Sequence, residues 1–147
     1  MKTVLAFGVF DLLHPGHLAF LRAAKKKGDR LIIAVTPDIR VKKEKGAPPF
    51  FGERERAAMV AAVRWVDRAV VGDRGRRWTL VRRLRPDVIC VGYDQRIDHP
   101  SFLAQIATMP KKPRLIRLPA MRPSRYASSR IKIEVHRRLA KRRAAVS

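Results

Sequence analysis

Short runs of consecutive apolar residues alternate along the chain with longer segments in which apolar residues recur every three or four positions. A continuous apolar run is typical of a strand covered on both faces. The three-to-four spacing predicts helices that bury one face. The predicted strands cover residues 2–7, 30–36, 65–71, 88–93 and 114–118. The predicted helices cover residues 15–27, 53–63, 76–84, 100–107 and 128–144.

Proline and glycine mark several of these boundaries. Pro15 suits the first position of a helix, where its missing N–H would have no intrahelical partner. Gly28 is placed to end that helix, Gly72 ends the third predicted strand, and Pro86 stops the third predicted helix. The basic stretch 41–50 shows no clear period and is expected to be a turn-rich loop.

Strand and helix alternate throughout, which predicts an α/β fold with a parallel sheet and right-handed crossovers. The expected architecture is a single Rossmann-like domain over residues 1–147, with five parallel strands and helices on both faces. Such sheets bind ligands beyond the carboxyl ends of their strands, beside the first strand.

The charge is the most unusual feature of the composition, because 34 Lys and Arg face 12 Asp and Glu, for a net charge of +22. That excess demands anionic partners or counterions. The basic residues are spread over the whole chain, so nucleotides or phosphorylated substrates are favoured over nucleic acid as partner.

Other features of the composition bear on location. No apolar stretch approaches the roughly 20 residues that span a bilayer, so no membrane partner is expected. Cys90 is the single cysteine and lies in an apolar run, which indicates a core residue and a cytoplasmic protein.

The segment Gly8-Val-Phe-Asp-Leu-Leu-His-Pro-Gly-His17 follows the first predicted strand. His14 and His17 lie three residues apart, on one side of the first helical turn. Free N–H groups at a helix start form an anion site, and Gly16 lets a ligand approach the backbone. Two imidazoles there suit a phosphate whose negative charge grows during reaction. The alternative is a simple strand–turn–helix corner with surface histidines.

This motif resembles the signature of the nucleotidylyltransferase superfamily, which includes cytidylyltransferases for alcohol phosphates, phosphopantetheine adenylyltransferase and archaeal-type FAD synthases. The resemblance implies that His14 and His17 stabilise the α-phosphate of a nucleoside triphosphate during direct in-line attack. Val9 stands where many relatives have threonine, so one hydroxyl contact to phosphate is absent. The resemblance assigns the other nucleotide contacts of this turn to Phe7, Gly8, Val9, Phe10 and Gly16.

The basic stretch 41–46 resembles the corresponding loop of archaeal FAD synthases, as does Glu53-Arg-Glu-Arg56. The resemblance implies an α-phosphate contact from Lys43 or Lys45, with Lys43 also near the substrate, and a substrate-phosphate contact from Arg56. A solvated charged loop is the alternative. Asp11 is expected either to orient the substrate or a metal-bound water, or to cap its own turn.

Two further segments resemble parts of the superfamily. Gly92-Tyr-Asp-Gln95 ends the fourth strand, where Gly92 permits close approach and Asp94 could accept hydrogen bonds from a ribose; an ordinary turn is the alternative. The stretch 122–131 resembles the second signature of the superfamily, in which paired hydroxyls at a helix start hold phosphates. The alternative is that a serine simply caps the helix. The resemblance implies nucleotide contacts from Arg122, Tyr126, Ser128 and Ser129.

Together these features favour transfer of AMP from ATP to FMN, as in FAD synthases. The alternative is a CTP-dependent transferase for glycerol phosphate or a similar alcohol phosphate, and a third hypothesis is a non-catalytic nucleic-acid-binding protein. Mg²⁺ or another divalent cation is expected, held mainly by the triphosphate, with its protein ligands unassigned. The resemblance also points to a homodimer. An apolar wall for a flavin is one expected role of Phe50, Phe51 and Trp78, and packing in the core is the alternative.

Overall fold

The computed structural model describes residues 1–95 and 100–146. Its centre is a sheet of five parallel strands in the order β3-β2-β1-β4-β5. At the middle of the sheet, Val4 pairs with Leu31 on one side and with Val88 on the other. The predicted fold class is confirmed, although the third strand begins three residues later than expected. The strands are β1 (Thr3–Gly8), β2 (Arg30–Val35), β3 (Arg68–Val71), β4 (Val88–Val91) and β5 (Arg114–Arg117).

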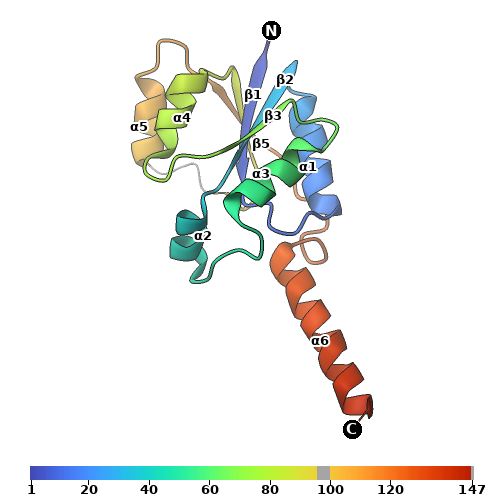
Figure 1. Ribbon diagram of the computed structural model, residues 1–147. Helices are drawn as coiled ribbons and strands as arrows, with labels where there is room; N and C mark the ends of the chain where they lie inside the picture. Colours follow the sequence, from blue (N-terminus) through green and yellow to red (C-terminus); the bar gives the residue numbers. More distant parts are fainter. Residues whose placement is uncertain (96–99, 147) are drawn as a thin grey trace.

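Helices cover both faces of this sheet, with α1 and α3 on one side and α4 and α5 on the other (Figure 1). The last helix, α6, extends away from the body of the molecule. None of the helices in the described part of the chain is long and apolar enough to cross a bilayer. The helices are α1 (Pro15–Lys25), α2 (Asp38–Lys45), α3 (Glu53–Ala61), α4 (Arg77–Leu84), α5 (Pro100–Ala107) and α6 (Ser128–Val146).

The helix α2 replaces the first half of the loop that the sequence predicted over residues 41–50. It starts after Pro37 with Asp38 in its first turn and ends at Gly46, whose φ of 77° is left-handed. Its lysines lie in the last turn, where cations favour the helix dipole. Val41 is its one buried residue, so the chain shows no apolar period from which a helix could be predicted.

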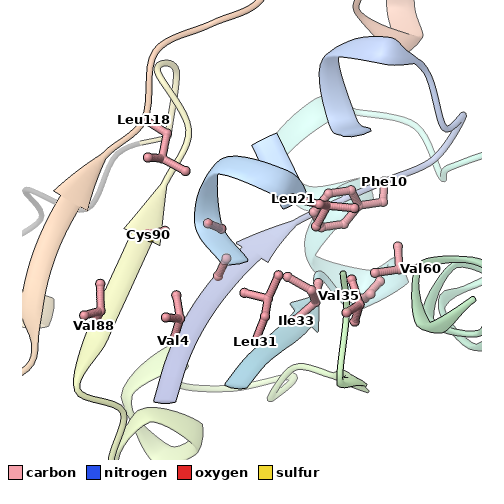
Figure 2. Close-up of a cluster of buried hydrophobic side chains, with 13 residues drawn as sticks. Val4, Phe10, Leu21, Leu31, Ile33, Val35, Val60, Val88, Cys90 and Leu118 are labelled. Atoms are coloured by element: carbon pink, nitrogen blue, oxygen red, sulfur yellow. The ribbon is translucent and has the colours of Figure 1, made fainter. Parts of the chain in front are cut away.

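Alternate residues of the central strands point to opposite faces and form two separate cores. Val4, Leu31 and Ile33 pack with α1 and α3 (Figure 2). Leu5 and Ile32 face the other way and pack with α4 and α5. This two-faced burial explains the continuous apolar runs in the sequence, because both faces of each central strand are covered.

Cys90 belongs to the first core and is fully buried. Burial raises the pKa of its thiol to about 11, so the thiol stays protonated. It is a packing residue, as predicted.

Candidate active site

A cavity of about 990 Å³ lies beyond the carboxyl ends of the strands. The turn after β1 and the start of α6 both form part of its wall, although they lie more than a hundred residues apart in sequence. Most of the predicted site residues meet there: Phe7, Gly8, Val9, Phe10, Asp11, His14, Gly16, His17, Lys45, Gly92, Asp94, Tyr126, Ser128 and Ser129. Lys43, Arg56 and Arg122 are not part of the wall.

The turn between β1 and α1 is built around the ring of Phe10. Phe10 has a left-handed backbone with a φ of 51°, which is strained for a residue other than glycine. Its ring is buried 5.1 Å from the ring of His17, between centroids. A Cβ on Gly8 would lie 2.5 Å from Cε2 of Phe10, so this position has no room for a side chain. The ring therefore shapes the floor of the cavity and fixes His17 above it.

His14 is the N-cap of α1, because its Nδ1 accepts a hydrogen bond of 3.1 Å from the N–H of Gly16. The ring proton of His14 consequently lies on Nε2. A Cβ on Gly16 would lie 2.9 Å from Cε1 of His14, so glycine lets the imidazole cover the helix start. The sequence placed both residues in one motif but did not predict this bond.

The two imidazoles are stacked with ring centroids 3.7 Å apart and planes inclined by 26°. Burial, followed by the proximity of His14, lowers the pKa of His17 to about 4. Burial also lowers the pKa of His14. Nδ1 of His17 is buried and has no hydrogen-bond partner in the described part of the chain. Both rings are therefore neutral at pH 7 in the free protein, able to donate N–H groups to an anion.

Asp11 is only 4% exposed and its carboxylate joins three segments. It accepts hydrogen bonds of 3.0 Å from the N–H groups of Phe50 and Phe51, and it forms an ion pair with Lys132 in α6. Burial alone would raise its pKa, but Lys132 and the two N–H groups hold the pKa below its usual value.

These contacts correct one of the sequence predictions for Asp11. Its oxygens are engaged by protein groups, so the carboxylate positions the cavity wall, and a role toward the substrate or a metal-bound water stays a prediction. It caps residues 50–51 and not its own turn. Lys132 was missed, although it follows Ser128 by one helical turn and so had to face the same side.

Arg56 was predicted to contact a substrate phosphate, and the structure contradicts this. Its side chain extends from α3 and is fully buried. Its guanidinium donates to the carbonyls of Val9 (2.7 Å), Thr36 (2.8 Å) and Phe51 (2.9 Å) and pairs with Asp38 at 2.6 Å. Val9 and Thr36 directly follow β1 and β2. Arg56 therefore satisfies carbonyl groups at the end of the sheet and holds the cavity floor from behind.

The helix α2 separates the two candidate lysines. Lys45 lies on the cavity wall, together with Arg40 and Glu44. Lys43 is exposed and lies off the wall, because residues two apart on a helix point in nearly opposite directions. Arg40, which no sequence motif indicated, donates to the carbonyl of Asp73 at 3.2 Å and so ties α2 to the segment after β3.

At the start of α6, the hydroxyl of Ser128 is used within the protein. It accepts a hydrogen bond from the N–H of Leu12 (3.2 Å) and donates to the carbonyl of Leu12 (3.1 Å). Ser129 is exposed on the cavity wall. Arg122 acts through its backbone: its φ is 44°, and its carbonyl accepts N–H groups from the turn before α6. The predicted side-chain contact of Arg122 with a nucleotide is therefore not supported by its position.

Gln95 holds the segment after β4. Its amide nitrogen donates to the carbonyl of Phe7 (2.7 Å), and its amide oxygen accepts the N–H of Gly92 (3.0 Å). Arg117 in β5 donates to the carbonyls of Gly92 and Gln95. These bonds present Gly92 and the exposed Asp94 to the cavity. The sequence singled out the segment that ends with Gln95, but nothing in it indicated that this amide would join the end of β4 to β1.

The β3 side of the cavity carries an aromatic ring and an unpartnered acceptor. Trp78 lines the wall, and the guanidinium of Arg76 lies 5.6 Å from its ring centroid. Oδ2 of Asp73 is buried without a hydrogen-bond partner in the described part of the chain. Phe50 is 74% exposed and lies off the wall, against Phe51. Of the three aromatic residues considered for a flavin wall, Trp78 alone lines the cavity.

No resident metal site is built into the described residues. They contain no group of three His, Cys, Asp or Glu side chains placed to hold a metal ion. Asp11, the carboxylate nearest the histidines in sequence, is already engaged by Lys132. The described side chains therefore do not form a metal site by themselves.

Comparisons of the sequence and of the structure with known proteins agree on one family. The cytidylyltransferase-like family profile matches residues 5–133. An FAD synthase of Pyrococcus abyssi is 43% identical over 79% of this chain and 79% of its own length. An FAD synthase of Methanothrix thermoacetophila is 38% identical over 91% of this chain and 92% of its own. A crystal structure described as a lipopolysaccharide core biosynthesis protein from Thermoplasma volcanium superimposes with a TM-score of 0.76 at 35% identity, covering 82% of this chain and 98% of that one.

Proposed function

The chain belongs to the cytidylyltransferase-like family, and we propose that it is an FAD synthase, which transfers AMP from ATP to FMN. The observation that carries the proposal is the extent of its identity with archaeal FAD synthases. The cavity supports the same conclusion, because it combines neutral imidazoles, a lysine and a helix start around one space.

In the proposed reaction, a phosphate oxygen of FMN attacks the α-phosphorus of ATP in line. A new P–O bond forms, the bond from the α-phosphorus to the bridging oxygen of the β-phosphate breaks, and that oxygen leaves with pyrophosphate. No residue is placed as a covalent nucleophile, so positioning and electrostatic stabilisation supply the rate enhancement.

The site residues divide into groups that touch the reactants and groups that hold the site. His14 and His17 donate N–H groups to the oxygens of the α-phosphate as charge accumulates. Lys45 neutralises that charge from α2. Ser129 and the free N–H groups at the start of α6 hold the leaving pyrophosphate. Asp94 accepts hydrogen bonds from the ribose, and the backbone of residues 7–10 and Gly16 lies against the nucleotide.

We assign the isoalloxazine ring of FMN to the β3 side of the cavity. Trp78 offers a flat aromatic face on which a planar heterocycle can stack. The buried Oδ2 of Asp73 lacks a donor, and leaving a buried acceptor unpaired is unfavourable. The N3–H of the flavin ring is the donor that would pair with it. This arrangement leaves the phosphate of FMN directed toward the histidines.

Four further features of this proposal rest on the family and on general chemistry. A divalent cation, Mg²⁺ by preference, accompanies the nucleotide and is held by triphosphate oxygens and water. The domain spans residues 1–147. The protein acts as a homodimer, and it works in the cytoplasm, where its single thiol stays reduced.

The test is an assay of the purified chain with Mg²⁺, FMN and either ATP or CTP, with glycerol phosphate as the competing acceptor. Formation of FAD and pyrophosphate with ATP alone supports the proposal. Formation of a CDP-alcohol from CTP and glycerol phosphate would refute it in favour of a cytidylyltransferase. Absence of product in every combination would refute both.

A further inference from the structure

Helix α6 extends beyond the part of the chain that the family accounts for. The family profile ends at residue 133, whereas α6 continues to Val146. The helix is attached to the body near its start, through Ser128 to Leu12 and through Lys132 to Asp11. From there it leaves the molecule (Figure 1). The proposed reaction uses only the first turn of this helix.

None of the 19 residues of α6 is buried. Ile133 is 67% exposed, Val135 51% and Leu139 52%. Helices in proteins gain most of their stability from tertiary packing, and this one has a surface that no described residue covers. A partner that covers residues 134–146 would supply that missing stabilisation.

The charge of the segment indicates what the partner is. Residues 134–146 contain one acidic side chain, Glu134, which is paired with both Arg137 and Arg138. The opposing positive charge is much larger. The basic residues of this segment are Arg137, Arg138, Lys141, Arg142 and Arg143.

The distribution of these charges separates the candidate partners. Val135, Leu139 and Arg142 follow at helical spacing, so Arg142 interrupts the apolar stripe. A second copy packed there would place arginine against arginine, and a lipid surface favours helices whose apolar face is free of charge. A chain of phosphates tolerates cations on several sides of a helix, and it releases counterions for each one that binds.

We propose that residues 134–146 of α6 bind the phosphodiester backbone of a nucleic acid, without sequence preference. Arg137, Lys141 and Arg142 contact phosphates, and the exposed apolar side chains lie against sugars and base edges. The surface is independent of the proposed FAD synthesis. It adds a nucleic-acid partner that the charge of the chain as a whole did not favour.

The test compares two variants of the full chain that lose the same charge. One carries Arg137→Gln, Lys141→Gln and Arg142→Gln; the other carries Arg22→Gln in the last turn of α1 together with Lys26→Gln and Lys27→Gln just after it. Binding to a labelled 20-nucleotide RNA and to a 20-base-pair DNA duplex is measured by fluorescence anisotropy over a range of salt concentrations. The two probes show whether the helix prefers RNA or duplex DNA. FAD formation by each variant is measured in parallel.

The α6 variant is expected to lose at least about tenfold in affinity, and its slope of log K against log salt on duplex DNA should fall by about 2.7, or 0.9 for each lost contact. The α1 variant should change far less, and both should keep their FAD synthesis. Equal losses in the two variants would overturn the proposal in favour of diffuse attraction. Absence of binding by the unmodified chain would overturn it as well.

Two further measurements test for the two partners that the charge distribution disfavours, a lipid surface and a second copy of this chain. Tighter binding to vesicles containing anionic lipid than to either probe, lost in the α6 variant, would replace the proposal with a membrane surface. A dimer in solution that dissociates in the α6 variant would replace it with a second copy of this chain.

Discussion

Replacing Arg56 with methionine provides the sharpest test of how the cavity is held. The change removes the guanidinium but keeps a long apolar side chain, so it adds little empty space to the core. The carbonyls of Val9, Thr36 and Phe51 each lose the donor that Arg56 provides.

The expected loss of stability follows from these bonds. Three part-buried carbonyls that each lose a hydrogen bond worth about 1–1.5 kcal/mol amount to about 3–4 kcal/mol. For a chain of this size, that loss lowers Tm by roughly 10 °C. Arg56→Lys keeps the charge but cannot reach all four acceptors, so it should lose about half as much.

The assay is thermal and urea unfolding of both variants, with Arg54→Met as the control. Arg54 is exposed on the same helix, and its replacement should change stability by no more than about 0.5 kcal/mol. If Arg56→Met unfolded like the unmodified chain but raised KM for FMN, Arg56 would be a substrate contact and the structural account would be refuted.

Four other changes test the remaining parts of the site. His17→Ala should lower kcat about 10²–10³-fold in a folded protein, and near-normal turnover would remove its role at the α-phosphate. Between pH 6.5 and 4 the unfolded chain takes up a proton that native His17, with its pKa of about 4, does not. Stability should therefore fall on acidification through this window, by up to about 3 kcal/mol at and below pH 4, and urea titrations of His17→Gln should show a smaller fall. Lys45→Ala should lower kcat about 10²-fold and Lys43→Ala less than about threefold, a contrast that equal losses would contradict. The unmodified chain should bind N3-methylated FMN about 5- to 100-fold more weakly than FMN, and Asp73→Ala should bind the two equally; discrimination that survives the change would exclude this pairing.

The sequence predicted those features that depend on local pattern. Strands such as β2 were evident because both of their faces are buried, and Pro15 marked the start of α1. The histidine turn could be assigned a function because His14, Gly16 and His17 lie within one helical turn. Their meeting with the start of α6 followed from the rule that ligands bind at the carboxyl ends of parallel strands.

The remaining features depend on contacts between distant residues. The orientation of Arg56 is set by carbonyls 5 to 47 residues away in sequence, and Gln95 bridges to Phe7 across 88 residues. The helix α2 was missed because its polar composition carries no apolar period. Lys43 and Lys45 could not be separated until that helix gave them opposite directions.

The ion pair between Asp11 and Lys132 has a consequence for how the protein is made. All five strands leave the ribosome before α6, so the sheet can assemble while the carboxylate of Asp11 still lacks its cation. The wall formed by the last helix is added only when Lys132 emerges. A nascent chain therefore carries an incomplete site after its sheet has formed, and nucleotide capture begins only once Lys132 has emerged.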